Sequence, residues 1–451
     1  MIGIVVSRAD SASEHIGEHL LDLGDFEEVG GGVYRADGFE LREFDELHID
    51  IEDPAAAFDD PDYVVVVSRH AGDTGALLTA HHTGNFGDAE YGGEDRSLAE
   101  TCPNAHRDVV AALREHAPEG YDVGMECTHH GPTEVSAPSM FVELGSGDEQ
   151  WDDPEGARAV AEAVLDLRGV GARSDRALVA FGGGHYAPRP TRIVEETGWG
   201  VGHVAADWCL DDLGDPEAHR DVVRRIFDAS GAEHAVVDGD EPAVERVVAE
   251  LGYRVVSETW VRESDGVLLD LVDSLERDVR QVDDGLRFGE RAAGYDDGYA
   301  VVDLPAGLLD AVHATDAEAA VNAAHETALA YATEENGNRL AGPAAFADDA
   351  AYDAFLDRVV GVLERDYDVG RENGTLTATQ EAFDPAAASD LGVPEGPKFG
   401  KLASGEPVTV DGAEVEPGDV TRTETATISV GFRERTRERV CRPSDAEGKG
   451  N

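Results

Sequence analysis

The chain has 451 residues, 41% of them hydrophobic, and its 95 acidic against 36 basic residues give a formal net charge of −59. This length exceeds what one hydrophobic core commonly serves, so two or three domains are expected. The sequence holds no apolar run of about eighteen residues, which excludes a membrane-spanning helix.

The N-terminal apolar run, residues 2–6, follows no basic segment, so a first strand is expected there and not a signal peptide. The four cysteines, Cys102, Cys127, Cys209 and Cys441, show no C-x-x-C spacing. This pattern favours reduced thiols in a cytosol over a disulfide framework or a cysteine-type zinc finger.

The acidic excess is dispersed along a chain with ordinary apolar patterning, and lysine occurs only at positions 398, 401 and 449. Such a surface is typical of proteins from molar-salt cytoplasms, because at low salt its self-repulsion destabilises the fold. We infer a haloarchaeal type of host. At about 1 M salt the Debye length is only about 3 Å, so the net charge does not exclude an RNA partner. It gives no support for one either, since counterion release then contributes little affinity.

Strand-like and helix-like segments alternate through residues 1–262. Strands are predicted at residues 2–6, 63–67, 76–80, 123–127, 140–144, 177–181, 201–205, 235–237 and 254–256, with a hairpin at 33–44. Helices are predicted from a capping-box pattern at 11–14 onward to 23, and at 104–116, 154–167, 216–229 and 242–251. This order predicts a three-layer α/β domain with a mostly parallel or mixed sheet.

The character of the chain changes over residues 263–451. Only two of the 16 histidines, His313 and His325, lie there. Acidic, alanine-rich helices are expected over residues 308–366 and a β-rich tail over 375–440. Because this appended acidic α+β region holds no cluster of catalytic residue types, the chemistry is expected in residues 1–262.

Histidines and carboxylates follow several of the predicted strands directly. The stretch Glu126 to Glu134 contains His129 and His130, and further strand ends carry His81 with Asn85, Glu143, and His185. Polar groups beyond the ends of strands are where α/β sheets present their sites. A neutral imidazole is a common zinc ligand, and a nearby carboxylate ligates, orients the ring or accepts a proton. The alternative is a set of hydrogen-bonded surface histidines, which four such strand ends make less attractive.

Three glycines, Gly182, Gly183 and Gly184, precede His185 after an apolar run. Successive glycine amides can form a nest for an oxyanion or phosphate, although a flexible turn is the plainer interpretation. The dinucleotide-binding pattern G-x-G-x-x-G with its acidic partner does not fit here.

Other candidates each have a structural alternative. His81 and Asn85 bracket Thr83-Gly84 as a base and an oxyanion donor, or else form an Asx-type turn. Glu143 is either a buried carboxylate of the site or the polar alternate residue of a strand, and His203 has the surroundings of a core histidine. Neither G-x-S-x-G nor H-E-x-x-H is present, so water activated by a metal or base is favoured over a serine nucleophile.

Together these blocks resemble the archaeal and plant type of D-aminoacyl-tRNA deacylase. The matching stretches are residues 81–87, 91–93, 126–134, 141–149 with Trp151, 182–188 and 202–203. The resemblance implies an α/β fold related to peptidyl-tRNA hydrolases and nucleoside phosphorylases. It also implies hydrolysis of the ester between a D-amino acid and tRNA, with zinc as cofactor. His82 stands where this family more often has an aliphatic residue, so the family role is carried to His81.

On this resemblance, zinc is expected on histidines among His129, His130, His185 and His203. Glu126 or Glu143 is expected to accept the proton of water, and Asn85 with the amides of residues 182–184 to stabilise the oxyanion. Thr83 and Tyr186 are expected to contact the substrate, a D-aminoacyl-tRNA. A metal-free mechanism, with His81 as the general base and Asn85 as the hydrogen-bond donor to the oxyanion, is the open alternative.

The rival hypotheses are a peptidyl-tRNA hydrolase-like esterase and a non-catalytic tRNA-binding protein. The expected setting is cytoplasmic, as a monomer, without membrane or DNA partners. Residues 391–402 resemble a short segment of the metallo-β-lactamase-type tRNA 3′-processing endonucleases, without their H-x-H-x-D-H motif. On this resemblance, Lys398 and Lys401 are candidates for binding tRNA. The alternative is that they belong to a Gly/Pro loop without a binding role.

Overall fold

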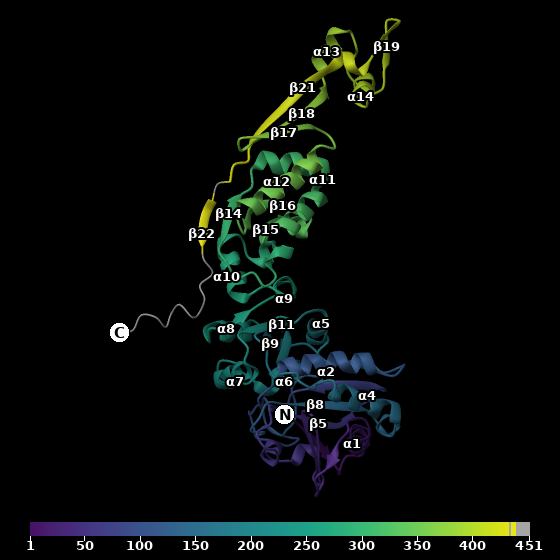
Figure 1. The fold of residues 1–451 in the computed structure, drawn as a ribbon, viewed down its shortest axis with the longest axis vertical. Helices are drawn as coiled ribbons and strands as arrows, with labels where there is room; N and C mark the ends of the chain where they lie inside the picture. Colours follow the sequence, from purple (N-terminus) through teal and green to yellow (C-terminus); the bar gives the residue numbers. More distant parts are fainter. Residues whose placement is uncertain (433, 439–451) are drawn as a thin grey trace, which may run out of the picture. The chain divides into compact units, whose positions relative to one another are not determined.

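The computed structural model describes residues 1–432 and 434–438. The chain forms two compact units, Met1–Asp265 and Gly266–Asn451, each described here by itself (Figure 1). The sequence-based boundary was placed at residue 262. The end of the predicted β-rich tail and Cys441 lie outside the described residues. None of the described helices is both long and apolar enough to cross a bilayer.

The larger sheet of unit 1 has eight strands in the order β2-β3-β4-β1-β5-β8-β6-β7. In chain order these are β1 (Ile2–Ser7), β2 (Glu27–Glu28), β3 (Val33–Ala36), β4 (Phe39–Phe44), β5 (Tyr63–Ala71), β6 (Leu77–His81), β7 (Asp122–Met125) and β8 (Ser139–Ser146). The strands β4, β1, β5 and β8 are parallel, whereas β6 runs antiparallel to β8 and parallel to β7. The prediction of a mixed α/β fold is confirmed, as is the β3–β4 hairpin.

The two faces of this sheet are covered differently. The helices α1 (Ser11–Leu23), α2 (Pro103–His116) and α4 (Pro154–Leu165) pack on one face, where α1 contacts β5 and α4 contacts β8. On the other face Val5, Val64, Val66 and Phe141 form a buried cluster with apolar residues of the segment 51–58. Helices therefore leave the second face to loops, and these loops carry the polar residues described below.

The second sheet of unit 1 is parallel throughout, with the order β10-β9-β11-β12. Its strands are β9 (Ala177–Gly182), β10 (Gly200–Ala205), β11 (His234–Asp238) and β12 (Arg254–Val255). The helices around it are α5 (Pro188–Glu196), α6 (Asp207–Leu213), α7 (Arg220–Ser230), α8 (Pro242–Glu250) and α9 (Glu258–Glu263), and α3 (Asp148–Trp151) follows β8. Since α2 contacts both β6 and β10, it joins the two sheets into one body.

Helix α1 shows how a strand end is tied to the loop face. Asp10 lies after β1 and accepts hydrogen bonds from the backbone N–H groups of Ala12 and Ser13, which caps the helix. The other carboxylate oxygen of Asp10 accepts from the Arg69 N–H and lies 3.2 Å from Nδ1 of His48. One buried carboxylate thus connects a helix start, β5 and a histidine of the loop face.

Unit 2 corrects two expectations from the sequence. Two strands, β15 (Ala330–Glu334) and β16 (Arg339–Phe346), separate α11 (Ala306–Thr327) from α12 (Asp349–Leu363), so residues 308–366 are not purely helical. Their alanines, among them Ala330, Ala332, Ala344 and Ala345, are buried, and tertiary burial outweighed helix propensity there. The expected β-rich tail contains two helices, α13 (Pro385–Asp390) and α14 (Pro397–Ala403), and Lys398 and Lys401 lie on α14.

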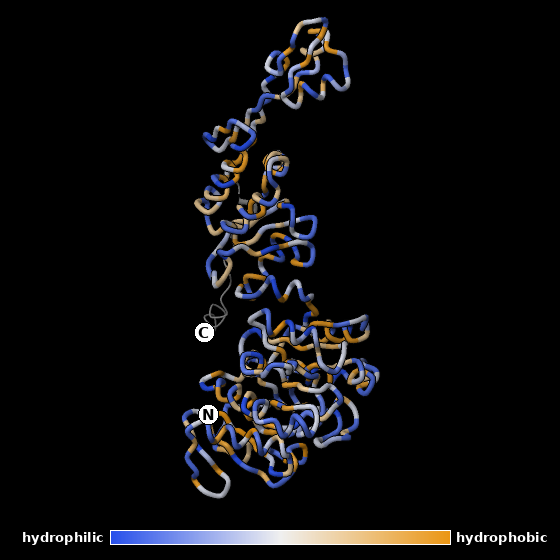
Figure 2. The backbone as a smooth tube through the Cα atoms, turned by 90° about the vertical axis from the view of Figure 1, so that its right-hand side faces the viewer, coloured by the Kyte–Doolittle hydropathy of each residue, from blue (hydrophilic) through white to orange (hydrophobic). Residues whose placement is uncertain are grey.

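Three sheets make up unit 2. The first has the order β13-β15-β16-β14-β22, with β13 (Leu286–Phe288), β14 (Tyr299–Asp303) and β22 (Glu434–Glu438). The second joins β17 (Asp368–Glu372), β18 (Thr375–Phe383) and β21 (Thr421–Ser429), and the third pairs β19 (Val408–Val410) with β20 (Ala413–Val415). The helix α10 (Leu269–Asp278) precedes β13. In both units apolar and polar segments alternate along the chain, as expected for packed elements (Figure 2).

Gly361 offers a test of local stability in unit 2. It lies in the last turns of α12, is exposed, and a methyl group there would meet no atom within 4 Å. We expect Gly361→Ala to raise the free energy of unfolding by about 0.5–1 kcal/mol, because alanine loses less backbone entropy in a helix. Denaturant unfolding at molar KCl measures this, and a variant less stable than the parent would contradict it.

Candidate active site

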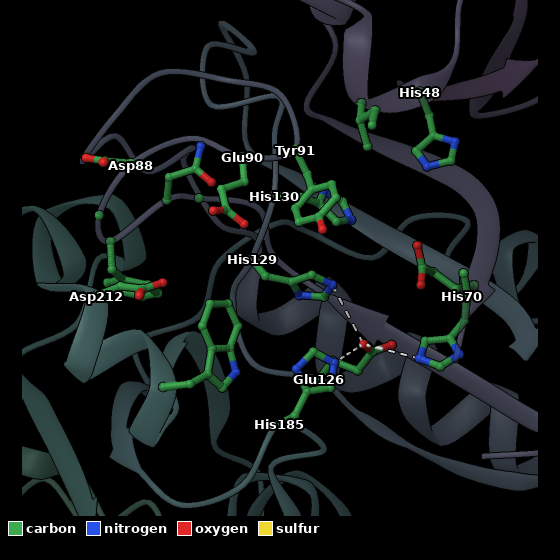
Figure 3. A pocket seen from close by; sticks show the side chains of 18 of the residues that line it. His48, His70, Asp88, Glu90, Tyr91, Glu126, His129, His130, His185 and Asp212 are labelled. Atoms are coloured by element: carbon green, nitrogen blue, oxygen red, sulfur yellow. Dashed lines mark hydrogen bonds and ion pairs between the residues drawn. The ribbon is translucent and has the colours of Figure 1, made fainter. Parts of the chain in front are cut away.

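A cavity of about 870 Å³ opens on the loop face of unit 1. Its walls come from the ends of β5 and β7, from β8, and from loops at residues 84–96 and 126–130. The polar and aromatic side chains that line it include His48, Arg69, His70, Asn85, Asp88, Glu90, Tyr91, Arg96, Glu126, His129, His130, Glu143, His185, Trp208, Asp211 and Asp212. Figure 3 shows the labelled members coming from separate strands, helices and loops around one space.

Glu126 is the centre of the polar network in this cavity. It follows β7 directly, and its carboxylate oxygen Oε2 accepts a hydrogen bond of 2.8 Å from Nε2 of His185. The same oxygen lies 3.6 Å from Nε2 of His70 and 3.8 Å from Nε2 of His129 (Figure 3). Burial alone would raise the pKa of Glu126. The hydrogen bond from His185 and the surrounding histidines lower this pKa by more than burial raises it, so the carboxylate is ionised. Its other oxygen, Oε1, is buried without a hydrogen-bond partner.

His81, His129 and His130 form a cluster of rings beside Glu126, in which His81 and His129 are stacked and His130 lies edge-on to both. The ring centroids lie 4.2 Å apart for His81 and His129, and 4.5 Å apart for His129 and His130. Burial holds the pKa values of His129 and His130 well below the ordinary value, and the neighbouring imidazoles lower them further. The two rings are therefore neutral and keep a lone pair for a ligand.

Glu143 and His81 form a second carboxylate–histidine pair. Nε2 of His81 lies 3.6 Å from Oε1 of Glu143, which also accepts a hydrogen bond of 2.8 Å from the Ser68 hydroxyl. Burial lowers the pKa of His81, but Glu143 outweighs it and leaves the pKa raised. In the antiparallel pairing of β6 with β8, His81 is opposite Phe141 and Glu143 is opposite Thr79, so the two residues are diagonal neighbours.

His185 joins Glu126 to a cysteine pair. Its Nδ1 lies 3.3 Å from Sγ of Cys127, and Cys209 Sγ lies 4.0 Å from Cys127 Sγ. The hydrogen bonds with Cys127 and Glu126 raise the pKa of His185 to about 10. The contacts with Cys209 and His185 lower the pKa of Cys127. Sequence reasoning had set the cysteines aside.

Two cavity histidines were missed from the sequence. His70 lies near the end of β5, and its Nδ1 is 3.0 Å from the Ser146 hydroxyl. The predicted strand ended at residue 67, whereas β5 continues to Ala71. With the longer strand, His70 would have been recognised as another histidine at a strand end. His48 lies in a short 3-10 helix, His48–Asp50, and no pattern in the sequence distinguishes it.

Three of the residues proposed from the sequence have structural partners. His203 is fully buried, its ring nitrogens lie 3.0 Å from the Thr128 hydroxyl and 2.9 Å from the Ala99 carbonyl, and it does not line the cavity. Asn85 lines the cavity, but its amide nitrogen donates to the carbonyls of Gly92 and Glu94. The hydroxyl of Thr83, also buried, donates to the Pro132 carbonyl and holds the histidine loop.

The glycine amides are not part of the cavity wall. The N–H of Gly183 donates to the Asp207 carboxylate at 2.7 Å, so a side chain of the same protein fills the nest. Gly182 has a φ of +83°, and a Cβ there would lie 2.0 Å from the Asp238 carbonyl oxygen. Gly184 does not line the cavity either. Tyr186 lines a neighbouring cavity of about 470 Å³, and its hydroxyl lies 3.4 Å from Nε2 of His70.

Within residues 1–432 and 434–438, the side chains offer three sets of metal-ligating atoms. In each set the atoms lie within 4.8 Å of one another, and the sets are His81 with His129 and His130, Cys127 with His129 and His185, and His70 with Glu126 and His185. Imidazole nitrogen, thiolate sulphur and carboxylate oxygen are the ligand types of zinc. Nε2 of His81 and Oε1 of Glu126 are buried without hydrogen bonds. The donor set therefore fits a zinc ion.

Gly131 places the histidine loop, which suggests a test. A Cβ at Gly131 would lie 2.4 Å from backbone atoms of Gly92 and Gly93, so the two loops cannot keep their positions. We expect Gly131→Ala to lower kcat/KM for the reaction catalysed in this cavity at least about 10²-fold, since small displacements of catalytic groups have effects of this size. Gly171→Ala is the matched control, because the nearest atom to its Cβ lies 4.0 Å away. Equal activity of the two variants would contradict the argument.

Comparison with known proteins assigns the family. The family model described as D-aminoacyl-tRNA deacylase matches residues 57–256. A D-aminoacyl-tRNA deacylase of Halobacterium salinarum is 61% identical over 453 residues, covering 100% of both chains. One of Halorubrum lacusprofundi is 53% identical, covering 94% of this chain and 96% of its own. These halophilic relatives share unit 2 and agree with the host inferred from charge.

A solved structure of a conserved protein of unknown function is also similar. It is 33% identical with a TM-score of 0.54 and covers 59% of this chain and 99% of its own. On the full-length matches, the chain belongs to the D-aminoacyl-tRNA deacylase family.

Proposed function

We propose that the cavity of unit 1 hydrolyses the ester between a D-amino acid and the terminal ribose of tRNA. In this proposal residues 1–262 form the catalytic domain, and 263–451 are an acidic extension that takes no part in the chemical step. The single observation that carries it is the Glu126 carboxylate at the cavity wall. Histidines surround its Oε2, and its Oε1 has no hydrogen-bond partner.

Glu126 is the proton acceptor in the proposed mechanism. An ionised carboxylate with one unpartnered oxygen accepts a proton from water as the water attacks the ester carbonyl. His185 orients Glu126 through the 2.8 Å hydrogen bond between its Nε2 and the carboxylate. Glu143 holds His81 against the ring of His129 in the same way, which keeps the stacked imidazoles in place.

The oxyanion donors differ from those expected from the sequence. Asn85 and Gly183 already donate to partners within the protein. The Tyr186 hydroxyl, on a ring 4.9 Å from that of His185, is the donor that we assign to the negative charge developing on the ester oxygen.

Zinc is the proposed cofactor, held by ligands drawn from His81, Cys127, His129, His130 and His185. Such an ion lowers the pKa of water and polarises a carbonyl. The fully buried His203 belongs to a separate group of rings with His82 and His106 and is no longer proposed as a ligand.

Deacylation assays at molar KCl test the function. D-Tyr-tRNA, L-Tyr-tRNA and N-acetyl-L-Tyr-tRNA are compared with one enzyme preparation. We expect rapid hydrolysis of D-Tyr-tRNA and no rapid hydrolysis of the other two substrates. Preference for the N-blocked ester would favour a peptidyl-tRNA hydrolase-like enzyme, and tRNA binding without cleavage would favour a non-catalytic module.

The proposed setting is the cytoplasm, where charged tRNA is used. A monomer without membrane or DNA partners is proposed. The parallel strands β4, β1, β5 and β8 support a relation to the folds of peptidyl-tRNA hydrolases and nucleoside phosphorylases. Helices cover only one face of this sheet, in place of the three layers expected from the sequence.

A further inference from the structure

The exposed aromatic side chains of the described residues gather at the two cavities. They are Tyr91, Trp208 and Tyr186, with 66%, 42% and 39% of their surface exposed. Tyr91 and Trp208 line the 870 Å³ cavity, and Tyr186 lines the neighbouring one. Exposed rings concentrated at a cavity are typical of a binding site, because burial by a ligand removes their apolar surface from water.

Trp208 is the exposed ring of the 870 Å³ cavity that lies beside His185. It lies on α6, and its ring centroid is 6.3 Å from that of His185, with an angle of 29° between the planes. His185 in turn binds Glu126. The indole therefore presents an apolar face one side chain away from the carboxylate that is proposed to act on the ester.

The charges around the cavity argue against recognition through phosphates. Asp88, Glu90, Asp211 and Asp212 line it alongside two arginines. Arg96 lies 3.8 Å from Asp88, and the Arg69 guanidinium lies over the ring of Trp151. In molar salt, phosphate contacts contribute little affinity, whereas stacking of a base on an aromatic ring involves no net charge.

We propose that Trp208 is the stacking platform for the base of the 3′-terminal nucleotide of tRNA. The inference rests on the proposed function, since the ester at Glu126 is attached to the ribose of that nucleotide. The acidic side chains next to the ring suit the exocyclic amine of adenine, which donates hydrogen bonds. Trp208 is thus a binding residue that positions the substrate and takes no part in proton transfer.

Two variants and three substrates test this with the full chain at molar KCl. Trp208→Leu keeps an apolar side chain without a ring, and Trp208→Phe keeps a ring. For D-Tyr-tRNA we expect Trp208→Leu to raise KM about 10-fold with kcat within about 2-fold, and Trp208→Phe to stay close to the parent. For Trp208→Leu the same increase in KM is expected with 3′-O-D-tyrosyl-adenosine. No increase is expected with D-tyrosine ethyl ester, which has no nucleobase.

Val29→Ala is the control for loss of an exposed apolar side chain, since Val29 is 54% exposed and lines neither cavity. An unchanged KM for Trp208→Leu with the adenosine ester would overturn the inference. So would an equal loss with the ethyl ester, because Trp208 would then act on the amino acid and not on the base.

A binding measurement separates this inference from the proposed function. The chain has four tryptophans, and stacking is expected to quench the fluorescence of Trp208 when uncharged tRNA is added. The quenching should be lost in Trp208→Phe. An enzyme that shows this quenching but does not cleave D-Tyr-tRNA contradicts the proposed function alone. An active enzyme without the quenching contradicts the inference alone.

Discussion

Glu126→Gln should lower kcat for D-Tyr-tRNA by about 10²–10⁴-fold with little change in KM. The amide keeps the size of the side chain and can still contact His185, but it cannot accept a proton from water. Rapid-quench deacylation at molar KCl measures the loss. A matched control is Glu90→Gln, because Glu90 also lines the cavity but is absent from the metal-ligating groups of the described residues.

The outcome that would contradict this role is a Glu126→Gln variant that keeps more than about a tenth of the parental kcat. Glu143→Gln then becomes informative, since Glu143 is the other buried carboxylate of the cavity. If only Glu143→Gln lowered kcat, the proton acceptor would be Glu143 on β8 and not Glu126 at the end of β7.

Removal of metal by a chelator should lower the deacylation rate about 10³-fold, because a bound ion contributes several kcal/mol to the stabilisation of charge in the transition state. Added zinc should restore the rate. Zinc content of the purified chain is a second readout, and His129→Gln should lower it, since His129 belongs to two of the three candidate ligand groups.

His116→Gln is the control for this experiment. His116 is a half-buried helix residue that pairs with Asp166 and belongs to none of the ligand groups in the described residues. Activity that survives thorough chelation would remove zinc from the proposal. The metal-free version with His81 as base would then be favoured, with Glu143 raising the pKa of that histidine.

Local sequence pattern was sufficient to locate most of the strand ends that carry the site. His81, Glu126 and the histidines 129 and 130 each follow a short apolar run closely, and alternation of burial along a strand is a local property. The high acidic content likewise predicted the halophilic character without any structure. Alanine-rich strands such as β15 and β16 were missed, because alanine favours a helix unless tertiary packing buries it.

Only the tertiary structure decided which groups are free to act. Whether the Gly183 amide is available depends on Asp207, which lies 24 residues further along the chain, and the Asn85 amide is used by the carbonyls of a neighbouring loop. His203 and His185 look alike in sequence, yet one is enclosed between backbone groups and the other binds Glu126. Hydrogen-bond partners in a folded chain are set by packing between distant segments, so the sequence determined where the polar residues occur and the fold determined which of them share one cavity.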